Sequence, residues 1–146
     1  MLIGGDHLLA RISSNPLVSR PLMRSPTHHA DQPRPRALLQ YMDSLRSTRE
    51  LPLRLVLPGH GDPIVDHAAL IDERLRMHRR RAARVLEILD RRPLSAYEIA
   101  QEMWGNVAVT QAYLTLSEVL GHLDLLVEMG QAAERDSDGK SLFEAL

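Results

Sequence analysis

Cysteine is absent from this 146-residue sequence, which excludes disulfide bonds and thiolate metal sites. Aromatic residues make up only 3% of the chain, so it has few stacking platforms for single-stranded nucleic acid. No apolar run reaches the roughly 20 residues that a membrane-spanning helix needs. Residues 1–10 also lack the basic start and long apolar centre of a secretory signal. These absences predict a soluble, cytoplasmic protein with no membrane partner.

Positive charge is missing from one part of the chain and concentrated in another. Residues 93–146 hold two basic and nine acidic residues, a net charge of −7. DNA affinity rests mainly on cations that contact phosphates, so DNA is not expected as a partner. Eight arginines cluster in residues 74–92, where they can contact phosphates. We favour the alternative, a solvated face on which arginines pair with nearby acidic residues, namely Asp72, Glu73, Glu87 and Asp90.

Two short segments each combine an apolar run, glycines and one side chain that can bind a metal ion. Residues 2–5 lead to Asp6, and residues 53–57 lead through a Pro-Gly turn to His60. Because glycine adopts backbone angles closed to other residues, each loop can aim its carboxylate or imidazole at one point. A Pro-Gly-His-Gly stretch alone is equally compatible with a surface turn. The presence of both segments favours a metal site that contains Asp6 and His60.

The Gly-Asp-His-x-Leu sequence at residues 5–9 is followed about fifty residues later by Leu-Pro-Gly-His-Gly at residues 57–61. This pairing resembles the C-terminal part of the metallo-β-lactamase-fold hydrolases. The resemblance implies an α+β fold with two parts. Residues 1–66 would form a remnant of the metallo-β-lactamase αββα sandwich, and residues 67–146 a mainly helical winged-helix domain of the kind found in the glyoxalase II-like branch.

The same resemblance assigns metal-binding roles. It implies that Asp6 bridges two metal ions, usually zinc, and that His60 completes the second metal site. The family's H-x-H-x-D-H motif has no counterpart among the histidines of this chain, which are His7, His28, His29, His60, His67, His78 and His122. Catalytic zinc needs three protein ligands and an open position for water, so two ligands do not make an active site. We assign no catalytic residue to this chain alone, and its substrate-binding residues are unknown.

These features predict the C-terminal portion of a zinc-dependent hydrolase that is inactive as this chain alone. The resemblance implies an ester, thioester or phosphodiester as substrate. The expected partner is the missing N-terminal part of the hydrolase domain. The alternative is a non-catalytic winged-helix module that serves interaction or homodimerisation. Whether the chain is an enzyme stays open between these two interpretations.

Residues 10–36 contain five prolines, which interrupt every helix pattern and predict a long loop. The resemblance places this loop near the mouth of the active site, where Asn15, Arg20 and Arg24 are candidate substrate contacts. A solvated connector is the alternative that we favour. The adjacent histidines at 28–29 cannot readily share one metal ion, so we assign them to the loop.

Hydrophobic periodicity predicts a helix over residues 36–49 and a long helix from Asp66 to near Pro93. The apolar stripe of the long helix includes His78, which we interpret as a packed side chain. Between the helices, residues 53–57 predict a buried strand. Few partner strands exist in this sequence, so an unpaired sheet edge is expected.

The C-terminal part shows clear start and stop signals. Ser95 and Glu98 form a capping-box pattern that predicts a short helix ending near Gly105. A longer helix follows, and Gly130 is placed to end it. A four-residue turn at residues 136–139 predicts a final β-hairpin. The longer helix is expected to present three acidic side chains, Glu118, Asp124 and Glu128.

Overall fold

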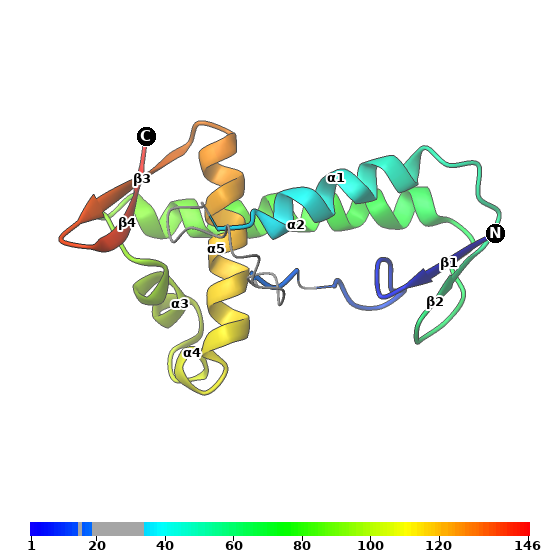
Figure 1. Ribbon diagram of the computed structural model, residues 1–146, viewed down its shortest axis with the longest axis horizontal. Helices are drawn as coiled ribbons and strands as arrows, with labels where there is room; N and C mark the ends of the chain where they lie inside the picture. The colour runs from blue at the N-terminus through cyan, green and yellow to red at the C-terminus, as the bar shows by residue number, and fades with distance from the viewer. Residues whose placement is uncertain (15, 19–33) are drawn as a thin grey trace, which may run out of the picture.

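The computed structural model describes residues 1–14, 16–18 and 34–146 of the chain. Its mixture of helices and strands confirms the predicted α+β class (Figure 1). The candidate substrate contacts Asn15, Arg20 and Arg24 and the adjacent histidines at 28–29 lie outside the described residues. In chain order the elements are β1 (Leu2–Gly5), α1 (Ala37–Arg49), β2 (Val56–Pro58), α2 (His67–Leu89), α3 (Ala96–Trp104), α4 (Val107–Thr110), α5 (Ala112–Glu128), β3 (Ala132–Ser137) and β4 (Lys140–Ala145).

Strands β1 and β2 form a two-stranded parallel sheet at one end of the molecule (Figure 1). The register pairs Leu2 with Val56. β2 therefore begins at Val56 rather than at the predicted Leu53, because β1 offers it a partner only from Leu2 onward. Within the described residues no third strand joins this sheet, but Val56 of β2 pairs with Ile64 through two backbone hydrogen bonds of 2.9 Å. Among the described residues, the prediction of an unpaired edge therefore holds for β1 only, while the edge of β2 is partly paired.

Helices α1 and α2 lie side by side, and α5 crosses them (Figure 1). The crossing of α1 and α5 requires a glycine, because a Cβ on Gly121 would lie 2.9 Å from the Cβ of Leu38. Helix α2 begins after Asp66 as predicted, and the Asp66 side chain accepts a hydrogen bond from the Ala69 backbone N–H at 3.0 Å. Its apolar stripe is buried, as the spacing predicted.

The C-terminal helices begin with the predicted capping box. The Ser95 hydroxyl oxygen accepts a hydrogen bond from the Glu98 N–H at 3.3 Å, and the Glu98 carboxylate accepts one from the Ser95 N–H at 2.9 Å. Helix α3 ends at Trp104, and Gly130, with a φ angle of 67°, follows the end of α5. The short helix α4 was not predicted, because four residues are too few to show a helical period.

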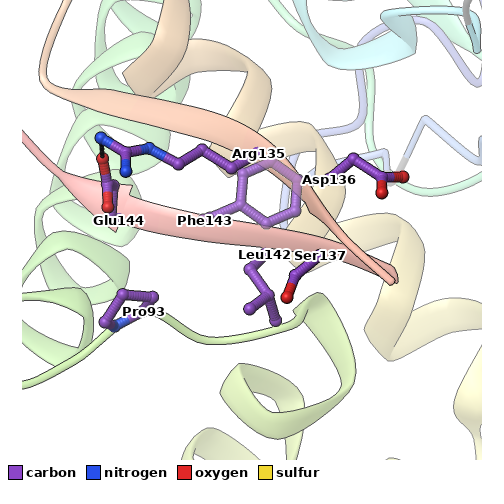
Figure 2. A pocket seen from close by; sticks show the side chains of 7 residues that line it. All are labelled: Pro93, Arg135, Asp136, Ser137, Leu142, Phe143 and Glu144. Atoms are coloured by element: carbon purple, nitrogen blue, oxygen red, sulfur yellow. Dashed lines mark ion pairs between the residues drawn. The ribbon is translucent and has the colours of Figure 1, made fainter. Parts of the chain in front are cut away.

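Strands β3 and β4 form the predicted hairpin, but its turn has two residues rather than four. Asp138 and Gly139 both have positive φ angles, 53° and 76°, which suit the twist of a tight hairpin. A bridge between the buried Leu94 and Phe143 joins the hairpin to the segment before α3. A hollow of about 230 Å³ lies beside this bridge. Figure 2 shows the side chains that line it, which come from Pro93 and from both strands.

The acidic residues of α5 pair with arginines from earlier in the chain. The pairs are Glu118 with Arg81 at 2.6 Å, Asp124 with Arg34, and Glu128 with Arg36 at 3.1 Å. The prediction of an exposed acidic face is wrong for Glu118 and Asp124, whose side chains are only 14% and 5% exposed. The reason is the tertiary packing, because α5 crosses α1 and α2, which turns this face toward Arg81 of α2 and toward the arginines just before α1.

The predicted solvated face of α2 is confirmed in part. Glu87 pairs with Arg84 at 2.9 Å, as expected. Asp72 instead accepts two hydrogen bonds from the Arg49 guanidinium of α1, at 2.7 and 3.0 Å. The Arg49 contact holds the pKa of the Asp72 carboxyl below its usual value. Arg74 is not on the solvated face at all, since it is only 6% exposed.

Most buried apolar side chains of the described residues form one connected core. It extends from Leu8 in the loop after β1 to Phe143 in β4, and it includes residues of α1, α2, α3 and α5. Both halves of the chain therefore contribute to the same apolar interior. The division into residues 1–66 and 67–146, with a winged-helix domain in the second part, stays a prediction.

Candidate metal centre

Asp6 and His60 lie next to each other at the carboxyl end of the parallel sheet. Asp6 directly follows β1, and His60 follows β2 by two residues. Asp6 Oδ1 lies 3.3 Å from His60 Nε2, and the two side chains are 71% and 61% exposed. Because the carboxyl ends of parallel strands share one edge, the two loops meet there. The structure thus brings together the two residues singled out in the sequence.

Backbone contact between the two loops sets this distance. The Gly59 N–H donates a hydrogen bond of 2.7 Å to the Gly5 carbonyl oxygen. A Cβ on Gly59 would lie 2.8 Å from Asp6 Oδ1 and 3.3 Å from the Gly5 carbonyl carbon. Gly59 is therefore needed for space, whereas Gly5 and Gly61 adopt positive φ angles of 50° and 86°.

The loop that carries Asp6 is anchored on helix α1. The carbonyl oxygen of His7 accepts a hydrogen bond from the Tyr41 hydroxyl at 2.9 Å, and His7 Nε2 lies 3.0 Å from Thr48 Oγ1. Burial lowers the pKa of the His7 imidazole. The sequence analysis missed Tyr41 and Thr48. Their spacing of seven residues, or two helical turns, could have shown that both side chains lie on one face of α1.

Helix α2 holds the next part of the same loop. The Arg74 guanidinium donates hydrogen bonds to the Leu9 and Ala10 carbonyl oxygens at 3.3 and 3.2 Å. Arg74 Nε is buried and has no hydrogen-bond partner in the described structure. The sequence placed Arg74 with the other basic residues of α2, because a run of arginines does not reveal which one turns inward.

His78 is packed, as predicted, and it contacts a second buried histidine. His78 Nδ1 lies 3.3 Å from His122 Nε2, and the two residues are 1% and 2% exposed. His122 Nδ1 lies 2.7 Å from the Glu118 carbonyl oxygen, which only accepts, so His122 carries its proton on Nδ1. His78 must then donate to His122 from Nδ1. Burial, together with His122, lowers the pKa of His78 to about 4.

The donor set of Asp6 and His60 fits part of a zinc site. Zinc is held by imidazole nitrogen and carboxylate oxygen, and both donors here are exposed and close together. Across the described ranges 1–14, 16–18 and 34–146, no group of three or more histidine, aspartate or glutamate residues is placed to hold a metal ion. These residues therefore supply two ligands of a site that needs at least one more.

Comparison with known proteins gives a consistent set of relatives. No protein-family model matches the chain. The chain is 38% identical over 142 residues to a "Probable metallo-hydrolase YqjP" of Bacillus subtilis (strain 168), covering 97% of this chain and 42% of that protein. A crystal structure of a β-lactamase domain protein from Burkholderia ambifaria matches 99% of the chain with a TM-score of 0.78 and 28% identity. This chain covers 41% of that structure.

The chain corresponds to part of a metallo-β-lactamase-fold protein. A metallo-β-lactamase family protein from Thermus thermophilus also matches 99% of this chain, with a TM-score of 0.74 and 23% identity, which supports the fold. The resemblance predicted from the sequence is confirmed. This metallo-β-lactamase-like chain spans about two fifths of the length of the relatives it matches, which agrees with a C-terminal part.

Three other predictions concern the location of the protein, the identity of the metal and the ligand roles. No helix in the described part of the metallo-β-lactamase-like chain is both long enough and apolar enough to cross a membrane. The cytoplasmic location stays a prediction. The same holds for zinc as the metal and for the roles of Asp6 and His60 as its ligands.

Proposed function

We propose that this chain is the C-terminal portion of a metal-dependent hydrolase and supplies two ligands, Asp6 and His60, to a dinuclear zinc site. The observation that carries the proposal is the 3.3 Å separation of Asp6 Oδ1 and His60 Nε2 at the end of two parallel strands. The similarity to a relative named as a probable metallo-hydrolase supports it.

The two side chains suit different roles. The Asp6 carboxylate has two oxygen atoms, so it can contact two cations, and its charge offsets part of theirs. His60 offers one imidazole nitrogen, which suits a ligand of a single metal ion. Bound zinc would supply Lewis acidity and a more acidic water for hydrolysis of an ester, thioester or phosphodiester.

The proposed partner is the N-terminal part of the hydrolase domain, carrying the remaining metal ligands. Two observations support this partner. Among the described residues β1 pairs only with β2, and a free strand edge can accept further strands. The chain also spans about two fifths of its relatives, so the complete fold needs additional residues. The whole protein's activity and substrate belong to this proposal.

A non-catalytic interaction or dimerisation module is the second candidate. It is favoured by apolar side chains that are 44% to 58% exposed over α3, α4 and the start of α5, namely Tyr97, Val107, Val109, Tyr113 and Leu114. Large exposed apolar surfaces commonly mark contacts with other proteins. This candidate needs no metal at Asp6 and His60.

The genomic sequence upstream of the Met1 codon separates the two candidates. If the reading frame continues through an H-x-H-x-D-H motif, the hydrolase proposal is supported. A stop codon and a ribosome-binding site directly before Met1 would instead favour the interaction module.

Metal content provides the biochemical test. In the longer protein, Asp6→Ala and His60→Ala are each expected to lower bound zinc, measured by elemental mass spectrometry, and to lower hydrolysis. Asp62→Ala is the matched control, because Asp62 is a neighbouring exposed carboxylate that pairs with Arg11 at 2.9 Å. Unchanged zinc content and unchanged hydrolysis in both test variants would sink the proposal.

A further inference from the structure

Helix α1 provides a rigid support behind the loop that carries Asp6. Three apolar side chains of this helix are at most 2% exposed, namely Leu38, Met42 and Leu45. The helix is thus fixed in the core, while Tyr41 and Thr48 reach from it to the loop. A contact to these two side chains ties the loop to the packed interior.

The loop changes direction between two successive residues. Asp6 points into solvent, but the next residue, His7, is tied inward by its ring and by its carbonyl oxygen. The His7 N–H also donates to the Gly4 carbonyl oxygen at 3.0 Å, which closes a tight turn. Asp6 lies within this turn, so its backbone position is tied to that of His7.

The hydrogen bond between Tyr41 and the His7 carbonyl oxygen can run in only one direction. A carbonyl oxygen can only accept, so the Tyr41 hydroxyl must donate its proton to His7. Burial raises the pKa of Tyr41, so the hydroxyl keeps this proton at neutral pH. The Tyr41 ring also meets the rings of His7 and His78 edge-on, with centroids 5.7 and 6.1 Å apart. These contacts hold the Tyr41 ring in place.

We propose that Tyr41 is a positioning residue for the metal ligand Asp6, and that its hydrogen bond to the His7 carbonyl oxygen fixes the direction of the Asp6 carboxylate. The inference rests on the proposed function, in which Asp6 binds a metal ion. Metal ligands must be held within about 0.5 Å of their working geometry, and hydrogen bonds behind them supply that precision. Loss of such a supporting hydrogen bond typically weakens metal binding about tenfold or more.

A zinc titration of the longer protein, in which the N-terminal part supplies the remaining metal ligands, tests this inference at the two ligand residues. The nuclear magnetic resonance signals of Asp6 and His60 are followed as Zn²⁺ is added to the wild type, Tyr41→Phe and Asp6→Ala. Tyr41→Phe removes one oxygen atom and keeps the ring packing. We expect it to weaken zinc binding at these two residues by about tenfold. A thermal unfolding curve checks that the variant is folded.

Two controls separate a positioning role from general loss of stability. Tyr97→Phe removes a hydroxyl that accepts a hydrogen bond from Gln101 within α3, and it should leave zinc binding unchanged. Thr48→Val should weaken binding in the same way as Tyr41→Phe, whereas Thr48→Ser, which keeps the hydroxyl, should restore it.

The outcomes distinguish this inference from the proposed function. If Asp6→Ala weakens zinc binding and Tyr41→Phe binds as tightly as the wild type, the positioning role is overturned and the ligand role stands. If the wild type shows no zinc response at Asp6 and His60, or Asp6→Ala leaves it unchanged, both are overturned. Weakening in Tyr41→Phe with normal binding in Tyr97→Phe supports the positioning role.

Discussion

Gly59 lies so close to the Asp6 carboxylate that position 59 has no room for a side chain. A Cβ on Gly59 would lie 2.8 Å from Asp6 Oδ1, and the Gly59 N–H already donates to the Gly5 carbonyl oxygen at 2.7 Å. The two loops therefore meet through backbone and carboxylate alone. This contact is what places His60 Nε2 within 3.3 Å of Asp6.

Gly59→Ala is expected to separate the two candidate ligands. The new methyl group must displace Asp6 Oδ1 or the backbone of Gly5, so zinc binding at Asp6 and His60 should weaken. Gly61→Ala is the matched control, because its Cβ meets nothing within 4 Å but its φ of 86° imposes a strain of roughly 1–2 kcal/mol. The control should lower stability without displacing Asp6. Equal zinc affinity for Gly59→Ala and the wild type would contradict the steric argument.

Gly121→Ala is expected to destabilise the protein although alanine favours helices. The added Cβ would lie 2.9 Å from the Cβ of Leu38, where α1 crosses α5. Overpacking of a core contact typically costs about 1–3 kcal/mol, which exceeds the gain in helix propensity of up to about 1 kcal/mol. Urea unfolding of the variant and wild type measures the difference. A higher midpoint for Gly121→Ala would show that the helices have room to separate.

Acidic pH is expected to destabilise the fold through His78. Its pKa is lowered to about 4 in the folded chain, whereas an unfolded histidine has a value near 6.5. Between these values the unfolded chain binds more protons, so stability falls as the pH decreases from about 6.5 toward 4. Between pH 7 and pH 5 the loss should be about 2 kcal/mol.

Chemical unfolding at pH 7 and pH 5 measures this dependence. His78→Gln should be less stable than the wild type at pH 7, because the packing with His122 and Tyr41 is lost. It should nevertheless lose less stability between the two pH values, since it carries one buried titrating group fewer. An equal loss in wild type and variant would assign the effect to other groups.

Local sequence signals correctly predicted most of the elements. The capping box at Ser95 and Glu98, the start of α2 after Asp66 and the stop at Gly130 depend on neighbours within a few residues. The same locality explains the helix boundaries of α1 and α3. For the candidate site, each loop could be found separately, because a glycine-rich turn after an apolar run is also a local pattern.

Contacts between distant segments account for what the sequence did not predict. β2 begins at Val56 because β1 pairs with it from Leu2, and Glu118 and Asp124 of α5 are shielded because α5 packs across α1 and α2. The inward turn of Arg74 and the support of the Asp6 loop by Tyr41 have the same origin.

The sequence by itself determined which residues have metal-binding chemistry, since Asp6 and His60 carry their donor atoms in any conformation. Only the tertiary structure decided that these donors lie 3.3 Å apart, that Gly59 leaves room for them, and that Tyr41 and Thr48 hold the loop from behind. The physical reason is that hydrogen bonds and steric exclusion act over a few ångströms in space. Helices and strands bring such groups together across long separations in the chain.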